Sequence, residues 1–249
     1  MSELRSKRSK KTETETESRT ASITWELIER VLGLSTLGRI YLWGKAGIGK
    51  TYCAYHKGRI ERGVYAITLT QEMPASELRG HYLPKGDHFE WHDGPVIRAM
   101  REGARLVINE ILHASDDVVS FLYPILEFTE TARITLPTGE TVTPAPGFHT
   151  VLTDNAAPDE LPAPLRDRFD AVLEINEPHP EALALLPEAL REVARRGFAL
   201  DDDRRVSIRG WLGVARLEAE LGLADACLVV FGAERGSQIY DAVVLARGC

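Results

Sequence analysis

The chain has 249 residues, which is enough for one large domain or for a domain with a small companion. Its 30 Lys and Arg against 37 Asp and Glu give a net charge of −7, which argues against a broadly basic nucleic-acid-binding surface. No apolar run reaches the roughly 18 residues that a membrane helix needs. Three cysteines without CxxC spacing argue against a disulfide framework or a zinc site. The composition therefore predicts a globular protein of the cytoplasm.

Residues 1–21 form a polar tail. Six Lys and Arg and four Glu among residues 1–20 give this stretch a charge of +2 and leave −9 for the rest of the chain. With almost no apolar residue the tail cannot offset its ordering entropy, so we expect residues 1–21 to be disordered. It is either a basic arm for RNA or a membrane surface, or a solubilising tail. The short and interrupted basic run favours the second interpretation.

A phosphate-binding motif follows the first expected strand, residues 39–43. It fits GxxxxGK[ST] and consists of Gly44, Lys45, Ala46, Gly47, Ile48, Gly49, Lys50 and Thr51. Its glycines let the backbone N–H groups turn toward a phosphate chain, and a helix expected from Lys50 to about Gly63 points its positive end at the same place. Lys50 is expected on the β- and γ-phosphates, and the Thr51 hydroxyl on Mg²⁺. The motif therefore predicts a nucleotide site with Mg²⁺.

A second acidic site is expected at the end of the apolar strand 104–108. Glu110 there is the candidate catalytic base, because its carboxylate can orient an attacking water beside the γ-phosphate. Asn109 precedes it, where such sites usually carry Asp. An amide can hydrogen-bond a water of the metal but brings no charge, so weaker Mg²⁺ binding or slower hydrolysis would follow. The alternative is an ordinary buried strand that ends in polar residues.

Further elements are expected between these two sites. The β-branched stretch 64–70 predicts a strand, and the Gly- and Pro-containing stretch 80–91 predicts a hairpin or loop insertion. Pro95 opens a helix that Gly103 closes. Three histidines, which lack the tight spacing of metal ligands, are interpreted as solvent-facing loop residues rather than a metal site: His81, His88 and His92.

In the second half of the chain, the predicted elements change from a mixture of helices and strands to helices alone. The amphipathic segment 115–128 predicts a helix that Pro124 kinks or ends early. A hairpin is expected over residues 133–142 and a strand over residues 148–153. Beyond Pro178 the apolar spacing predicts helices, with Pro187 splitting or kinking the first of them and Ser207 capping a later one.

The segment SELRGHYLPKGDHFEWHDGPVIRAMREGARLVINEI, residues 76–111, resembles the MoxR/CbbQ-like, dynein-related branch of the AAA+ ATPases. The likeness extends over residues 25–249. It implies an α/β fold in which residues 22–176 form a P-loop core, with a parallel sheet between helices. The core carries an insertion in its second helix and a β-hairpin before the first sensor. Residues 177–249 are then expected to form a small helical lid.

The resemblance also assigns roles to individual residues. Asn155 is similar to the first sensor, whose amide helps to orient the water held by Glu110. The segment 161–169 resembles the arginine-finger segment, which reaches the nucleotide of a neighbouring subunit. Arg166 and Arg168 are both candidates there and Arg168 is preferred, with surface ion pairing as the alternative. Arg209 resembles the lid arginine that touches the γ-phosphate of its own subunit.

The function implied by the resemblance is hydrolysis of ATP with Mg²⁺ by a homo-oligomeric ring, expected to be a hexamer. Similar proteins remodel, activate or assemble protein clients, often with a partner that carries a von Willebrand factor A-type domain. The main alternative is a nucleotide-binding assembly or switch subunit, with little hydrolysis because Asn109 replaces Asp. A motor acting on nucleic acid is disfavoured by the acidic body of the chain, and no membrane partner is expected.

Overall fold

A five-stranded parallel sheet forms the centre of the protein in the computed structural model, which describes residues 23–198 and 205–247. The expected disordered tail, residues 1–21, lies outside these ranges. The order of the strands is β2-β5-β8-β1-β9, and all neighbours are parallel. Their bounds are β1 Arg39–Trp43, β2 Val64–Thr68, β5 Arg105–Asn109, β8 His149–Asp154 and β9 Ala171–Glu174. The predicted α/β class with a parallel sheet is therefore confirmed.

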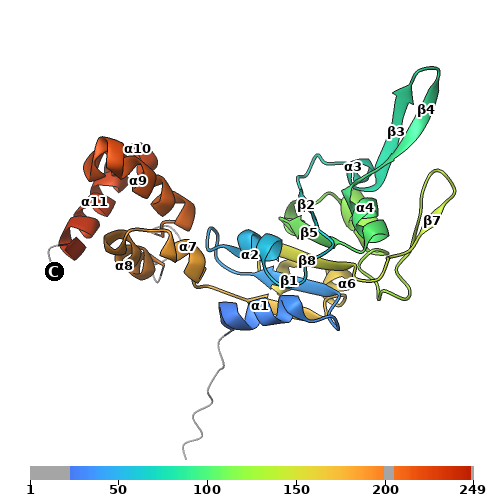
Figure 1. The fold of residues 1–249 in the computed structure, drawn as a ribbon, viewed down its shortest axis with the longest axis horizontal. Helices are drawn as coiled ribbons and strands as arrows, with labels where there is room; N and C mark the ends of the chain where they lie inside the picture. The colour runs from blue at the N-terminus through green and yellow to red at the C-terminus, as the bar shows by residue number, and fades with distance from the viewer. Residues whose placement is uncertain (1–22, 199–204, 248–249) are drawn as a thin grey trace, which may run out of the picture.

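Helices cover both faces of this sheet (Figure 1). The helices of the core are α1 Trp25–Gly33, α2 Lys50–His56, α3 Ala75–Arg79, α4 Pro95–Glu102, α5 Asp116–Leu122 and α6 Ala163–Arg166. Strand β1 shows the two layers, because Ile40 and Leu42 pack in one apolar cluster with α1 and α2, while Tyr41 packs in the other with α4 and α5. Burial on both faces explains why the central strands are continuously apolar rather than alternating.

Two hairpins leave the core. β3 Gly80–Lys85 pairs with β4 His88–Asp93, and β6 Ile134–Thr135 pairs with β7 Thr141–Val142, as the sequence predicted. The β3–β4 hairpin projects from the core at the end farthest from the C-terminal helices (Figure 1). His81, His88 and His92 are exposed, but they lie on its strands and not in a loop. Within residues 23–198 and 205–247, no group of three or more His, Cys, Asp or Glu side chains is arranged to hold a metal ion.

The C-terminal helices form a lid beside the core (Figure 1). They are α7 Pro180–Ala184, α8 Glu188–Gly197, α9 Ile208–Leu221, α10 Leu223–Phe231 and α11 Ala233–Arg247. Pro187 separates α7 from α8, and the Ser207 hydroxyl caps α9 by accepting from Gly210 N, as predicted. None of the helices in the described part of the chain is long and apolar enough to cross a membrane.

Helix α2 and strand β2 end earlier than the sequence indicated, and helix α5 ends where it was expected to end. Helix α2 stops at His56 instead of continuing toward Gly63, because Gly58 adopts a φ of 76° and a Cβ there would lie 2.4 Å from Leu32 O. Strand β2 ends at Thr68, two residues before the expected bound. Helix α5 ends ahead of Pro124, because proline has no backbone N–H to donate within a helix.

A buried arginine lies at the amino ends of the strands, the end of the sheet opposite the phosphate loop. Arg105 is 1% exposed, and its guanidinium donates through Nη1 to Ala54 O at 2.8 Å and Lys57 O at 2.5 Å, and through Nη2 to Leu32 O at 3.2 Å. These carbonyls belong to the last turns of α1 and α2. Its Nε donates to His149 Nε2 at 2.9 Å. One side chain thus ties two helix C-termini to strands β5 and β8.

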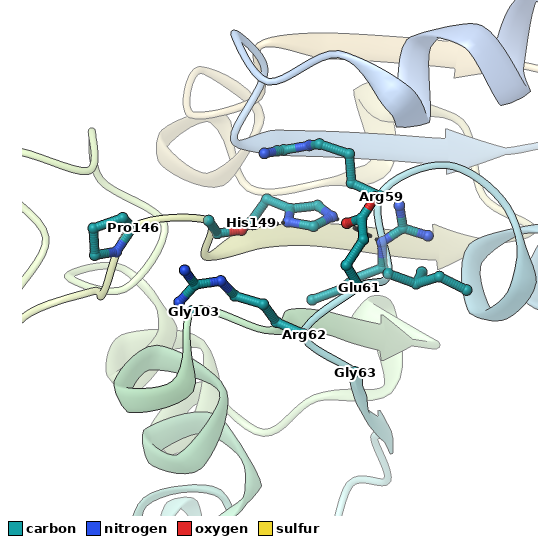
Figure 2. Close-up of a pocket in the computed structure, with 10 residues that line it drawn as sticks. Arg59, Glu61, Arg62, Gly63, Gly103, Pro146 and His149 are labelled. Carbon is teal, nitrogen blue, oxygen red and sulfur yellow. Dashed lines mark hydrogen bonds between the residues drawn. The ribbon is translucent and has the colours of Figure 1, made fainter.

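His149 stands at a cavity of about 290 Å³ that Arg59, Glu61 and Arg62 also line (Figure 2). Its tautomer follows from its partners: Nδ1 lies 2.8 Å from Gly147 O and must donate, so Nε2 is free to accept from Arg105. A proton on Nε2 would remove that acceptor. Burial, with the charges of Arg105 and Arg59 acting in the same direction, lowers the pKa of His149 to about 4.

This lowered pKa predicts a loss of stability in acid. Neutral His149 contributes fully above about pH 6.5, and the contribution is lost as the pH falls toward 4, because the unfolded chain takes up the proton first. Over that window the effect amounts to about 3 kcal/mol. Urea unfolding of wild type and His149→Gln at a series of pH values measures it. The stability difference between the two proteins should shrink from pH 7 to pH 4, and a constant difference would contradict the assignment.

Candidate nucleotide-binding site

The phosphate loop, Gly44–Thr51, joins β1 to α2 and is built on three glycines with positive φ. Gly44 has a φ of 139°, Gly47 of 70° and Gly49 of 110°, conformations that L side chains rarely adopt. Neighbouring segments also fill the space that a side chain would need. A Cβ would lie 1.8 Å from Ile175 O at Gly44, 2.4 Å from Ser207 Cβ at Gly47 and 2.7 Å from His179 Cβ at Gly49. Glycine is therefore required at all three positions by both conformation and packing.

Lys50 lies buried beneath this loop, with 6% of its surface exposed. Its ammonium donates to Gly44 O at 2.9 Å, to Lys45 O at 2.7 Å and to Asn155 Oδ1 at 2.9 Å. The structure thus brings the predicted first-sensor residue into direct contact with the predicted phosphate-binding lysine. Burial lowers the pKa of Lys50 to about 8, and the negative charges of Glu110 and Asp154 oppose this shift.

A cavity of about 660 Å³ opens in front of Lys50, between the core and the lid. Its volume lies in the range that small-molecule sites occupy. Most of the predicted site residues line it together with residues of the lid, namely Ala46, Gly47, Gly49, Lys50, Thr51, Glu110, Asn155, Ser207 and Arg209. Gly44, Lys45 and Ile48 complete the loop without lining the cavity. The cavity therefore collects the predicted phosphate-binding groups and carboxylates at the carboxyl ends of parallel strands, where α/β proteins bind ligands.

Glu110 occupies a strained turn directly after β5. Its φ of 60° makes it the one non-glycine residue with positive φ in the described part of the chain. Its N–H donates to Thr153 O at 2.9 Å, and the short 3₁₀ helix Ile111–His113 follows. Strained backbone at a carboxylate that lines a cavity is typical of functional sites. The turn places the Glu110 carboxylate on the same cavity as Thr51.

Asn109 is engaged in hydrogen bonds within the sheet. It is 5% exposed, and its Oδ1 accepts from Thr153 Oγ1 at 2.7 Å. Its Nδ2 donates to Ile67 O at 3.2 Å and Thr68 Oγ1 at 3.4 Å. The amide therefore bridges β2, β5 and β8, and it is not among the residues that line the cavity. The structure thus does not bring Asn109 to the cavity with the other predicted site residues, and its contact with a metal-bound water stays a prediction.

Asp154, which the sequence analysis did not single out, does line the cavity. It is 5% exposed. Its Oδ1 accepts from Asn155 N at 2.7 Å and Ala156 N at 3.2 Å, and its Oδ2 accepts from Leu112 N at 3.1 Å. The available signal was modest: Asp154 is the only acidic residue of the strand that precedes the predicted sensor.

The candidate arginines differ in their surroundings. Arg168 is held by residues of its own chain: its Nη2 pairs with Glu127 at 2.5 Å, its Nη1 donates to Pro164 O and its guanidinium stacks on Tyr123. Arg166 is exposed on α6, and its side chain makes no hydrogen bond or ion pair with the residues that the structure describes. Arg209, also exposed, stands in the first turn of α9, where Ile208 N donates to Gly47 O at 3.1 Å.

The fold and the site define a P-loop nucleotide-binding protein. Residues 39–169 match the family described as AAA domain (dynein-related subfamily), and the chain belongs to this family. The match confirms the resemblance to the MoxR-like AAA+ ATPases.

The chain is also similar in sequence to several curated proteins. The chain is 34% identical to Protein NorQ of Paracoccus denitrificans over 190 residues, covering 73% of this chain and 64% of that protein. It is 31% identical to the denitrification regulatory protein NirQ of Pseudomonas aeruginosa over 117 residues, 47% of this chain and 45% of NirQ. It is 29% identical to Protein CbbQ of Hydrogenophilus thermoluteolus over 148 residues, 56% of this chain and 54% of CbbQ. The chain thus spans about half to two thirds of the length of these relatives.

The contacts of Asn109 predict the effect of restoring the acid that this position usually carries. In Asn109→Asp both Nδ2 donors are lost and a carboxylate faces Ile67 O, so the free energy of unfolding should fall by about 1–3 kcal/mol at pH 7. Urea unfolding measures this. The loss should shrink in acid, where a protonated carboxyl donates again, and unchanged stability at pH 7 would contradict the bridging role.

Proposed function

We propose that this protein binds ATP with Mg²⁺ and hydrolyses it as a ring-shaped homo-oligomer, expected to be a hexamer, that remodels, activates or assembles a protein client in the cytoplasm. The observation that carries the proposal is the convergence of Lys50, Thr51, Glu110, Asn155 and Arg209 at one cavity. The family supports ATPase activity as the general chemistry. The boundary between nucleotide core and lid is proposed near residue 176, ahead of α7.

The groups around the cavity fit Mg²⁺, because a threonine hydroxyl and carboxylates are the hard oxygen ligands that this ion prefers. Thr51 would hold the ion, which supplies neutralisation of charge on the phosphate oxygens. Lys50 would bind the β- and γ-phosphates. Glu110 would orient the attacking water and accept its proton, and Asn155, fixed through Lys50, would align the same water. Arg209 would contact the γ-phosphate from the lid.

Ring formation would complete the site with an arginine from the next subunit. Arg166 is the better candidate by its surroundings, because it is exposed and its side chain bonds none of the described residues, whereas Arg168 would first have to leave Glu127 and Tyr123. A head-to-tail contact of this kind closes into a ring when its rotation allows.

Client binding is supported by the β3–β4 hairpin. Three large apolar side chains of this projecting hairpin are exposed: Tyr82 at 45%, Leu83 at 40% and Phe89 at 70%. Exposed aromatic surface on a projecting element is typical of protein-contacting sites. A partner with a von Willebrand factor A-type domain is part of the proposal.

A switch that binds nucleotide with little hydrolysis is the second candidate. The observation in its favour is Asn109, which brings no charge and whose amide is engaged within the sheet. Nucleotide binding would then stabilise an assembly by linkage rather than drive it.

The steady-state ATPase rate tests the proposal, with Lys50→Ala as background. Glu110→Gln should lower kcat about a hundredfold or more while ATP still binds, because only the base is lost. Glu72→Gln, the same change at an exposed position away from the cavity, should match wild type. A wild-type rate no higher than that of Lys50→Ala would support the switch instead. In the presence of ATP, Glu110→Gln should also retain the client in a pull-down, and recovery of nothing but its own chain would remove support for remodelling.

Arg166→Ala should lower the ATPase rate of the assembled protein by about a thousandfold. Its action in trans is tested by mixing Arg166→Ala subunits with Lys50→Ala subunits. In the mixture the Lys50 site of an Arg166→Ala subunit can face the Arg166 of a Lys50→Ala subunit. The activity of the mixture should therefore exceed that of either variant alone. Arg168→Ala should chiefly reduce thermal stability. The same complementation obtained with Arg168→Ala, and not with Arg166→Ala, would reverse the assignment.

A further inference from the structure

We propose that Asp154 supplies the second negative charge at the metal end of the nucleotide site, the task that the sequence pattern gives to residue 109. This inference rests on the proposed function, since it concerns how the site would bind Mg²⁺ with ATP.

The first argument is position. Strand β8 lies between β5 and β1, and Asp154 is its last residue. In the register of the sheet Asp154 pairs with Trp43, the residue immediately before the phosphate loop, while its predecessor Thr153 pairs with Asn109. Both Thr153 and Asp154 line the cavity with Glu110 at this end of β8, whereas Asn109, which bonds Thr153, does not. Asp154 is therefore the carboxylate that the end of β8 presents to the cavity.

The second argument is the way in which the carboxylate is held. Three backbone N–H groups donate to it, two from the start of the following loop and one from Leu112, two residues beyond Glu110. Backbone N–H donors of this kind suit an ionised carboxylate. Asp154 therefore carries its charge at a fixed point and also fixes the turn on which Glu110 stands.

The third argument is that the Asp154 carboxylate can accept a further hydrogen bond. A carboxylate offers about four lone-pair sites, and the three N–H donors leave one on Oδ2. Mg²⁺ usually keeps several of its waters, so a carboxylate that accepts from a metal-bound water is a common form of contact. Asn109 brings no charge, its amide is used to bridge three strands, and it does not line the cavity. The charge of Asp154 also reaches the phosphate-binding lysine, where, with Glu110, it opposes the effect of burial on the pKa of Lys50.

The test is the Mg²⁺ dependence of nucleotide affinity, a readout that does not require turnover. The full chain is titrated with a non-hydrolysable ATP analogue by calorimetry, once with Mg²⁺ and once with EDTA. In wild type Mg²⁺ should tighten binding. In Asp154→Asn this tightening should fall by about 10–100-fold, the usual cost of losing an outer-shell partner of a metal. The affinity in EDTA should be unchanged or higher, because a negative charge near the phosphates is gone.

Asp159→Asn is the matched control, since Asp159 is exposed on the next short helix, Pro158–Glu160, and does not line the cavity. It should behave as wild type. Equal losses of affinity with Mg²⁺ and with EDTA in Asp154→Asn would reduce Asp154 to a structural role and overturn the inference, as would an unchanged Mg²⁺ effect. A wild type that binds the analogue in neither condition would instead remove the proposed function itself, and this inference with it.

Discussion

The absence of side chains at three positions of the phosphate loop is the constraint on which the rest of the site depends. Gly44, Gly47 and Gly49 turn the backbone through positive φ, and each also makes room for a segment that arrives from the end of the sheet or from the lid. Turn geometry alone would explain glycine in most phosphate loops. Here the close approach of the strand-to-lid connection and of α9 adds a second reason that is independent of any ligand.

The same contacts set the place of the lid. His179 N donates to Ile48 O at 2.8 Å, and Ile208 N donates to Gly47 O at 3.1 Å, so two lid helices begin on the backbone of the loop. Arg209 follows directly after the second of these bonds. Its distance from Lys50 is therefore governed by backbone contacts rather than by the packing of the lid helices against one another.

The sequence predicted the local parts of this arrangement and missed those that depend on distant contacts. The phosphate loop, the helix cap at Ser207 and the helix break at Pro187 are short-range patterns, and the structure has the cap and the break where they were expected. The orientation of Asn109 depends on Ile67 and Thr153, more than 40 residues away in the chain. Asp154 likewise depends in part on a distant contact, its bond to Leu112, and no local pattern contains that bond.

The buried Arg105 has a consequence for how the core can move. Its guanidinium binds carbonyls at the end of α2 while its backbone belongs to β5, the strand that ends at Glu110. The helix behind the phosphate loop and the strand that carries the catalytic candidate are therefore fastened together at the end remote from the nucleotide site. We therefore expect them to move together, so that opening of the cavity involves the lid and its two attachments more than the spacing between Lys50 and Glu110.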